Sequence, residues 1–369
     1  MVQVDAEVTG IMLARALNEI HDQIASDGVP VRQDSSLPLT ARRALSQLSA
    51  HCLLSGPRYE DLGSSVHLLM AMACKPFGDW GLPEFREPYL YADVNLIDPD
   101  NAVPTEDCRE LARLGSGGEI ALQEERHHER LQAAIKGLTA KQRSKAYTSL
   151  REFCVRNPAV TNAELHGHIS KDGLIAAAQT LLSSYRPIPL GALFGGKAHR
   201  CAHCRSLLWP DKDIASYPDG RCRIRQCRLA HPNASCGEVI DRPADWRVAI
   251  EGVLAFWVGP GLDEIRIFDA LLAKGLQATL YPLADAADVG LDGLKVGIDV
   301  KTYASPLLLG ARLTRSIGRL ATFERKIIAV PDDKLRLNKR YLEQLRASYH
   351  GAEALEFRTT GSVIEEFAG

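Results

Sequence analysis

Residues 287–301 read ADVGLDGLKVGIDVK, and this stretch decides how the C-terminal part of the chain folds. Asp292-Gly293 lies between two runs of alternating apolar and polar residues, which is the strongest short-range signal of a β-hairpin. With these two residues as the loop, Leu291 faces Leu294, and one face of the hairpin is wholly apolar. That face carries Val289, Leu291, Leu294, Val296, Ile298 and Val300.

The opposite face of the hairpin carries the candidate catalytic groups. Asp288, Asp299 and Lys301 gather near its open end. Two carboxylates and a lysine suit metal-dependent phosphodiester cleavage, because carboxylates hold Mg²⁺ and a lysine orients the attacking water and steadies charge on phosphorus. Glu264, in the preceding helix, can add a third carboxylate. Asp285 falls on the wrong face unless a bulge intervenes.

The elements around the hairpin predict an α/β domain. Helix signals cover 245–257 and, after Gly259-Pro260-Gly261, residues 262–272. A strand is expected at 277–281. Ser305-Pro306 begins a helix that is expected to reach Leu320. A strand at 326–331, a helix at 337–349 and a strand at 355–357 complete an α-β-β-β-α-β order.

Five of the nine cysteines fall between residues 201 and 236, which predicts a metal site in a reducing compartment. Cys201-x2-Cys204 has the spacing of a zinc knuckle. We expect Cys227 and Cys236 to complete a closed, structural zinc site, because a Gly after the last Cys suits a knuckle turn. Cys222 is the rival, as Cys222-x4-Cys227, unless it is simply buried in a strand. The remaining alternative donors are His199, His203 and His231.

Residues 1–196 are expected to be mostly helical, with a long polar helix from about 119 to 136. In the group from 139 to 184, an ordinary helical bundle is favoured over a helix-turn-helix. The proline- and glycine-rich stretch 186–196 is the best linker. The predicted regions are therefore 1–138 (all-α), 139–196 (helical, then linker), 197–242 (zinc-ribbon-like) and 243–369 (the α/β domain).

The net charge of −2 hides an uneven distribution. Residues 1–196 have a net charge of −5 and residues 197–369 of +3. An acidic stretch, 243–300, lies between basic stretches at 197–242 and 301–340. This is the layout that a DNA-cutting site needs, so the near-neutral total does not exclude nucleic acid. In the basic stretch, one helical stripe of arginines is either a phosphate-binding surface or a solvated face: Arg312, Arg315 and Arg319.

The helix, the three-strand meander and the strand Ile298-Asp299-Val300-Lys301 resemble the PD-(D/E)xK restriction-endonuclease fold. The resemblance covers about 245–369. It implies that Asp288 is the first acid, that Asp299 and Lys301 form the (D/E)xK pair, and that Glu264 is the helix glutamate of many members. No proline precedes Asp288, which departs from the family motif.

The whole architecture resembles the REase-type protein associated with prokaryotic PIWI-RE systems. That resemblance implies a defence role against invading DNA, with a PIWI-RE protein and a DinG-like helicase as partners. It favours a Mg²⁺-dependent DNA endonuclease. The alternative is a zinc-ribbon nucleic-acid-binding or assembly module with an inactive nuclease fold.

The sequence contains no run of about 18 apolar residues, and its first residues do not form a signal peptide. The expected location is the cytoplasm.

Overall fold

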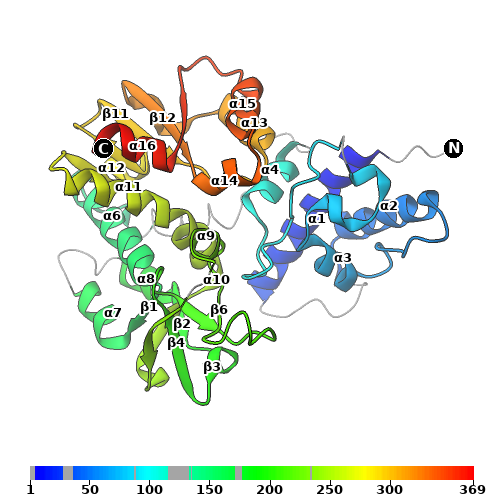
Figure 1. The fold of residues 1–369 in the computed structure, drawn as a ribbon, viewed down its shortest axis with the longest axis horizontal. Helices are drawn as coiled ribbons and strands as arrows, with labels where there is room; N and C mark the ends of the chain where they lie inside the picture. Colours follow the sequence, from blue (N-terminus) through cyan, green and yellow to red (C-terminus); the bar gives the residue numbers. More distant parts are fainter. Residues whose placement is uncertain are drawn as a thin grey trace. The chain divides into compact units, whose positions relative to one another are not determined.

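The structure of the chain is a computed structural model that describes residues 5–27, 36–86, 89–114, 133, 135–170, 177–232 and 235–369 (Figure 1). Most of the polar helix expected at 119–136 lies outside the described residues. The chain divides into two compact units. Unit 1 contains residues 1–123, 303–315 and 343–350, and unit 2 contains 124–302, 316–342 and 351–369.

Unit 1 is helical in its described part. Helix α1 (Ala6–Asp27) packs against α2 (Leu39–Ser55) and α4 (Glu106–Leu114), and a short α3 (Val66–Ala73) follows α2. Two 3₁₀ turns, η2 (Phe77–Trp80) and η3 (Pro83–Phe85), bring together an aromatic cluster. The Phe77 ring is tilted against those of Trp80 and Phe85, and the Trp80 and Phe85 rings form a T-shaped pair. These buried rings supply the apolar area that short helices need in order to stay packed.

A helix from late in the sequence completes unit 1. Helix α13 (Pro306–Arg315) begins where Asp107 of α4 accepts the backbone N–H groups of Ala304 and Ser305, at 2.8 and 2.9 Å. The helix start expected at Ser305-Pro306 is confirmed. Its expected end at Leu320 is wrong, because α13 ends at Arg315 and the chain turns through Gly318 (φ 60°) into the 3₁₀ helix η8 (Gly318–Thr322). Helix α15 (Tyr341–Ser348) lies mostly in the same unit.

Unit 2 contains a five-stranded sheet, the large sheet, with the strand order β13-β12-β11-β10-β9. Its strands are β9 (Ala278–Leu280), β10 (Val289–Leu291), β11 (Val296–Val300), β12 (Arg325–Val330) and β13 (Glu356–Thr359). Neighbours from β9 to β11 are antiparallel, and β11, β12 and β13 are parallel. Helix α11 (Gly259–Ala273) packs against β9, β10 and β11, and α16 (Thr360–Ala368) packs against β12, β13 and α11. Helix α14 (Asp332–Leu337) follows β12.

The hairpin β10–β11 forms with a longer turn than the sequence predicts. Leu291 pairs with Val296 rather than with Leu294, so the turn contains the four residues 292–295. A shift of two residues keeps every side chain on its predicted face, because the side-chain period of a strand is two. The paired residues end at Val289 and Ile298, and the Asp288 backbone N–H donates to the Ile298 carbonyl at 3.1 Å, so Asp288 lies at the open end of the hairpin, next to the β11 segment that carries Asp299.

A second, three-stranded sheet of unit 2 joins segments on either side of the cysteine region. Its order is β1-β8-β2, with β1 (Ala159–Thr161), β2 (Tyr185–Pro187) and β8 (Trp246–Ala249), all antiparallel. The helix expected from residue 245 is therefore wrong at its start. A short α10 (Glu251–Val253) and a π-helical stretch, η7 (Leu254–Val258), instead run into α11 without a break at Pro260, which lies in the first turn of α11.

The cysteine region forms a small sheet of its own. It contains β3 (Leu193–Phe194), β4 (Lys197–Cys201), β5 (Leu207–Trp209), β6 (Arg221–Cys222) and β7 (Cys236–Ile240), and α9 (Arg225–Ala230) follows β6. Strand β4 pairs with β3, β5 and β7. Apolar residues of this region share a core with the three-stranded sheet: Ala192, Ala198, Leu207 and Ile240 pack with Ala159 and Val248.

The helices α6 (Ala140–Arg156), α7 (Asn162–Ile169) and α8 (Ala178–Ser183) complete unit 2. Thr139 begins α6 with a capping box in which its side chain and that of Gln142 satisfy each other's backbone N–H groups. Gly261 of α11 has no side chain where α11 crosses α6, and a Cβ there would lie 2.5 Å from Val155. Because the helices cross so closely, Arg151, one turn before Val155 on α6, contacts Glu264, one turn after Gly261 on α11.

Candidate functional site

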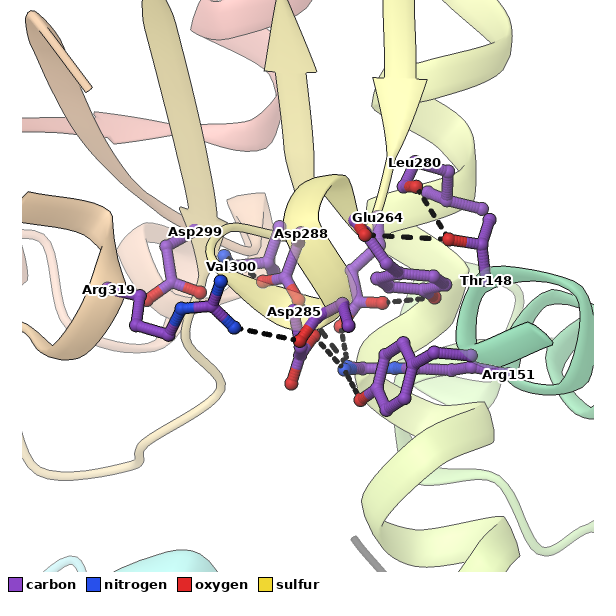
Figure 2. A network of polar contacts seen from close by, with 12 residues as sticks. Thr148, Arg151, Glu264, Leu280, Asp285, Asp288, Asp299, Val300 and Arg319 are labelled. Carbon is purple, nitrogen blue, oxygen red and sulfur yellow. Dashed lines mark hydrogen bonds and ion pairs between the residues drawn. The ribbon is translucent and has the colours of Figure 1, made fainter. Parts of the chain in front are cut away.

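The predicted carboxylate pair converges at the ends of β10 and β11 (Figure 2). Asp288 is 5% exposed, and one of its carboxylate oxygens accepts the Val300 backbone N–H at 2.7 Å. Lys301 Nζ lies 2.8 Å from Asp299 Oδ2. The hairpin register, together with this hydrogen bond, therefore holds two carboxyl groups and an ammonium group at one place.

Glu264 reaches the same place from α11. Its side chain is 1% exposed, and the Tyr281 hydroxyl donates to Glu264 Oε2 at 2.6 Å. Burial raises the pKa of the Tyr281 phenol well above its ordinary value, so this hydroxyl stays a donor. The structure thus brings together all four residues predicted as catalytic: Glu264, Asp288, Asp299 and Lys301.

An arginine that sequence reasoning missed lies at the centre of the acidic groups. Arg151 of α6 forms ion pairs with Glu264 at 2.9 Å, Asp285 at 2.6 Å and Asp288 at 3.4 Å (Figure 2). Its guanidinium lies over the Tyr281 ring, 4.3 Å from the centroid. A buried carboxylate is costly unless it is paired, and Arg151 supplies that pairing for the two buried ones, Glu264 and Asp288.

The sequence does contain a signal for Arg151. Helix α6 buries one stripe, and Arg151 interrupts it between apolar or aromatic positions, namely Tyr147, Leu150, Cys154 and Val155. A lone arginine on an otherwise apolar helical stripe indicates a buried ion pair, since long charged residues are rarely buried alone.

Asp285 belongs to the site, although strand alternation placed it on the wrong face. The residues before it do not form a strand. Tyr281, directly before the short turn α12 (Pro282–Asp285), and Leu283, Ala284 and Asp285 within it all have positive φ, from 47° to 78°. This left-handed turn points Asp285 at Arg151, as strand parity could not predict.

Burial and neighbouring charges separate the pKa values of the acids. Burial raises the pKa of the Glu264 carboxyl, and burial together with the charges of Glu264 and Asp299 raises that of Asp288 well above its usual value. Burial alone would also raise the pKa of Asp299, but the Lys301 ammonium and a hydrogen bond with Asp288 hold it below its usual value. Asp299 is therefore the ionised member of the pair, and Asp288 is the member that holds a proton more tightly.

Four cysteines of the cysteine region converge into one cluster. The sulfurs of Cys201, Cys204, Cys222 and Cys227 all lie within 4.8 Å of one another, and all four side chains are buried. Cys204 Sγ lies 3.5 Å from Cys222 Sγ, and Cys201 Sγ lies 3.8 Å from Cys227 Sγ. Sulfurs that each lie about 2.3 Å from one tetrahedral ion are separated by about 3.8 Å, so this cluster could bind a metal such as zinc.

The cluster corrects the predicted ligand set, because Cys222 takes the place given to Cys236. Strand β6 ends at Cys222, and α9 begins three residues later, so the chain turns and Cys227 faces Cys222. Cys236 Sγ instead donates to the Glu238 carbonyl at 3.2 Å. The alternative histidine donors also stand outside the cluster: His199 stacks on Phe194, and His203 stacks on His231 with ring centroids 3.8 Å apart.

The predicted arginine stripe does not form on one helix. Arg312 and Arg315 lie on α13, whereas Arg319 lies in η8. Arg315 forms an ion pair with Glu110 at 2.6 Å. Arg319 is in unit 2 and donates to the Ala284 carbonyl at 3.4 Å, beside the acidic groups (Figure 2). Glu251, in the turn before α11, forms an ion pair with Arg186.

These features define a mixed α/β protein with a buried acid–lysine cluster and a four-cysteine cluster. Residues 261–367 match the family model described as REase associating with pPIWI_RE, and residues 11–161 match pPIWI_RE three-gene island domain Y. No curated protein and no solved structure matches the chain. The two matches support an association with pPIWI-RE systems and are consistent with a PIWI-RE partner. The name of the first suggests a restriction-endonuclease-like enzyme with a nuclease role in a defence system.

The two matched regions meet within the site. Arg151 lies in the region that matches domain Y, and Glu264, Asp288, Asp299 and Lys301 lie in the region that matches the REase family. Among the described residues, no helix is long and apolar enough to cross a membrane.

Proposed function

We propose that the chain is a Mg²⁺-dependent DNA endonuclease of the PD-(D/E)xK type that acts in a PIWI-RE-associated defence system. The observation that supports this most is the position of the Asp288 carboxylate at the end of β11, where it accepts the Val300 backbone N–H at 2.7 Å, with Lys301 Nζ 2.8 Å from the Asp299 carboxylate. The element order around them, α11, then β9–β11, α13 and β12, matches the order expected for this fold. DNA and a DinG-like helicase are its proposed partners, and the cytoplasm is its proposed location.

The donor set of Asp288 and Asp299 fits a hard divalent cation. The two carboxyl groups share a hydrogen bond, and the pKa of Asp288 is raised by burial and by the neighbouring acids. A bound cation would relieve the repulsion between two neighbouring carboxyl groups that otherwise share a proton. Mg²⁺ prefers oxygen donors such as these. When bound, Mg²⁺ would lower the pKa of a water and neutralise charge on the phosphate.

The residues of the chain have separable roles in this proposal. Lys301, held beside Asp299, would orient the attacking water and stabilise charge that develops on phosphorus. Arg151 and Tyr281 would fix Glu264 and Asp288, since both bond to buried carboxylate oxygens. The four-cysteine cluster would hold Zn²⁺ and serve as a scaffold or DNA contact, because four thiolates leave no open position for water.

The test is cleavage of supercoiled plasmid by the purified full chain with and without Mg²⁺. Asp299→Asn and Lys301→Ala should each reduce cleavage by at least about a hundredfold, in line with the loss of a transition-state electrostatic group. Matched controls come from the exposed hairpin turn: Asp292→Asn and Lys295→Ala should cut at the rate of the unchanged protein. Undiminished cutting by Asp299→Asn or Lys301→Ala would refute the assignment.

A zinc-ribbon nucleic-acid-binding or assembly module with an inactive nuclease fold is the second candidate. Arg151 favours it, because its guanidinium already forms ion pairs with Glu264, Asp285 and Asp288, the acids that a cation would otherwise bind. This candidate requires salt-sensitive DNA binding without any Mg²⁺-dependent cleavage, and binding that Asp299→Asn leaves unchanged.

A further inference from the structure

A cavity of about 600 Å³ opens beside the acidic groups of unit 2. The first turns of α6 line it with Ala140, Lys141, Arg143, Ser144 and Lys145. The left-handed turn at Leu283 and Ala284 and the side chain of Arg319 complete it. Its volume falls within the range of about 300–1,000 Å³ that is usual for ligand pockets.

The charge of this cavity is of one sign. Four of its eight lining residues are cationic, and none is acidic. Lys141 and Lys145 lie one helical turn apart and are both exposed, so their ammonium groups repel each other. The N-terminal end of α6, a 17-residue helix, adds the positive end of its dipole to the same place. An anion bound between these groups would relieve the repulsion.

Hydrogen bonds connect the cavity wall to the acidic groups. Ser144 Oγ accepts the Ala284 backbone N–H at 3.2 Å, and Arg319 donates to the Ala284 carbonyl at 3.4 Å. The next residue, Asp285, forms the 2.6 Å ion pair with Arg151. The backbone at Leu283 and Ala284 is held at φ 55° and 57°, a conformation that residues other than glycine rarely adopt and that often marks a functional site.

We propose that this cavity binds the phosphodiester backbone of a nucleic acid beside the bond that is cut. The position of this site beside a cleaved bond rests on the proposed nuclease function, whereas the binding of nucleic acid by the cavity does not. Lys141, Arg143, Lys145 and Arg319 contact phosphate oxygens, and α6 carries these contacts and Arg151 on one rigid element. A strand that lies in the cavity therefore continues toward Asp288, Asp299 and Lys301.

This assignment changes which residues carry nucleic-acid binding. Phosphate contacts position a nucleic acid without reading its sequence, so the cavity should bind any sequence with a strong dependence on salt. The residues expected to carry that dependence come from α6 and Arg319, rather than from the arginines of α13.

The experiment measures binding of a fluorescein-labelled duplex DNA to the full chain by anisotropy, in EDTA so that no metal-dependent cleavage occurs. The triple variant Lys141→Gln, Arg143→Gln, Lys145→Gln should weaken binding at least tenfold. It should also reduce the slope of log K against log salt concentration by about two to three, the change expected when three phosphate contacts are lost. A single-stranded oligonucleotide of the same sequence, measured in parallel, shows whether the cavity binds one strand or a duplex, and a loss on either form supports the proposal.

The matched control removes the same charge from exposed positions of unit 1. Arg43→Gln, Arg58→Gln, Lys75→Gln should leave the salt slope within experimental error of the unchanged protein. Equal effects of the two triple variants, or no binding of either nucleic acid by the unchanged chain, would overturn the proposal. Thermal unfolding of each variant checks that it is folded, and Lys141→Glu, a single change at an exposed residue, repeats the test if the triple variant is not.

The outcome separates this proposal from the nuclease proposal. A chain that binds through the cavity but cuts nothing in Mg²⁺ would refute the nuclease function and keep the cavity assignment. If the chain cuts DNA but its α6 triple variant binds DNA as well as the unit 1 control variant does, the nuclease function would stand and the cavity assignment would be refuted.

Discussion

Among the described residues of unit 2, we expect substitution of Arg151 to lower the stability of the fold most. Arg151 is 9% exposed, and removing it takes away the guanidinium that forms ion pairs with the buried Glu264 and Asp288. We predict that Arg151→Met lowers the free energy of unfolding by about 3–5 kcal/mol, the cost of breaking a buried ion pair by removing one partner. Urea unfolding followed by circular dichroism measures this change.

The same helix provides the control. Arg156 lies on the same helix, in the turn that follows Arg151. It forms an ion pair with Asp269, and both side chains are partly exposed to solvent. Solvent screening limits such a pair, so Arg156→Met should cost less than about 1 kcal/mol. A second check is the double variant Arg151→Met, Glu264→Gln, which should recover part of the loss. If Arg151→Met were no worse than Arg156→Met, Arg151 would not be the counter-ion of the buried acids.

At single residues, the sequence predicted the acids on regular strands and missed the groups whose positions depend on tertiary contacts. Asp288, Asp299 and Lys301 follow from alternation in one hairpin, which is a local property. Arg151 comes from a helix that is distant in sequence, and Asp285 from a left-handed turn. The apolar stripe of α6 indicates that Arg151 is buried but not which acids it pairs with, because its partners depend on the crossing of α6 with α11. The position of Asp285 depends on a backbone conformation that residue spacing does not describe.

At the scale of elements, the fold of the cysteine region distinguishes Cys222 from Cys236 as a candidate zinc ligand. The structure includes Cys222 in the four-sulfur cluster and leaves Cys236 outside it. We predict that Cys236→Ser retains about one zinc ion per chain, whereas Cys222→Ser retains about none, because a closed site needs four ligands. Metal analysis by mass spectrometry, with thermal unfolding of both variants, gives the answer. Equal zinc content in the two variants would contradict this ligand set.

The prediction of elements succeeded in the large sheet and failed for the three-stranded sheet, none of whose strands was expected. All five strands of the large sheet were expected, and the hairpin faces are as predicted although its turn is two residues longer. The region before α11 was read as one helix, but Trp246–Ala249 is strand β8, because β1 and β2 offer it partners on both sides. Those partners lie on distant parts of the chain, so local periodicity carries no information about them.

At the scale of the whole molecule, unit 1 depends on residues that are far apart in sequence. Asp107 of α4 is 5% exposed and accepts the N–H groups of Ala304 and Ser305, where α13 begins. We predict that Asp107→Ala lowers the free energy of unfolding by about 2–3 kcal/mol, since one buried and one partly buried N–H group lose a charged acceptor. Hydrogen exchange should show faster exchange at the start of α13.

Asp93, an exposed acid of the same unit, is the control for this change. Asp93→Ala removes the same charge and should alter stability by less than about 0.5 kcal/mol, as surface substitutions usually do. Faster exchange spread evenly over unit 1, instead of concentrated at α13, would argue against a local capping role for Asp107.

The interlaced course of the chain has a genetic consequence. Unit 1 takes segments from before residue 124 and after residue 302, and the site of unit 2 takes Arg151 from one family-matched region and its acids from the other. A recombination that separated residues 11–161 from residues 261–367 would leave α13 without its cap and the buried acids without their counter-ion. Selection should therefore keep both matched regions in a single reading frame, so that they are inherited as one gene.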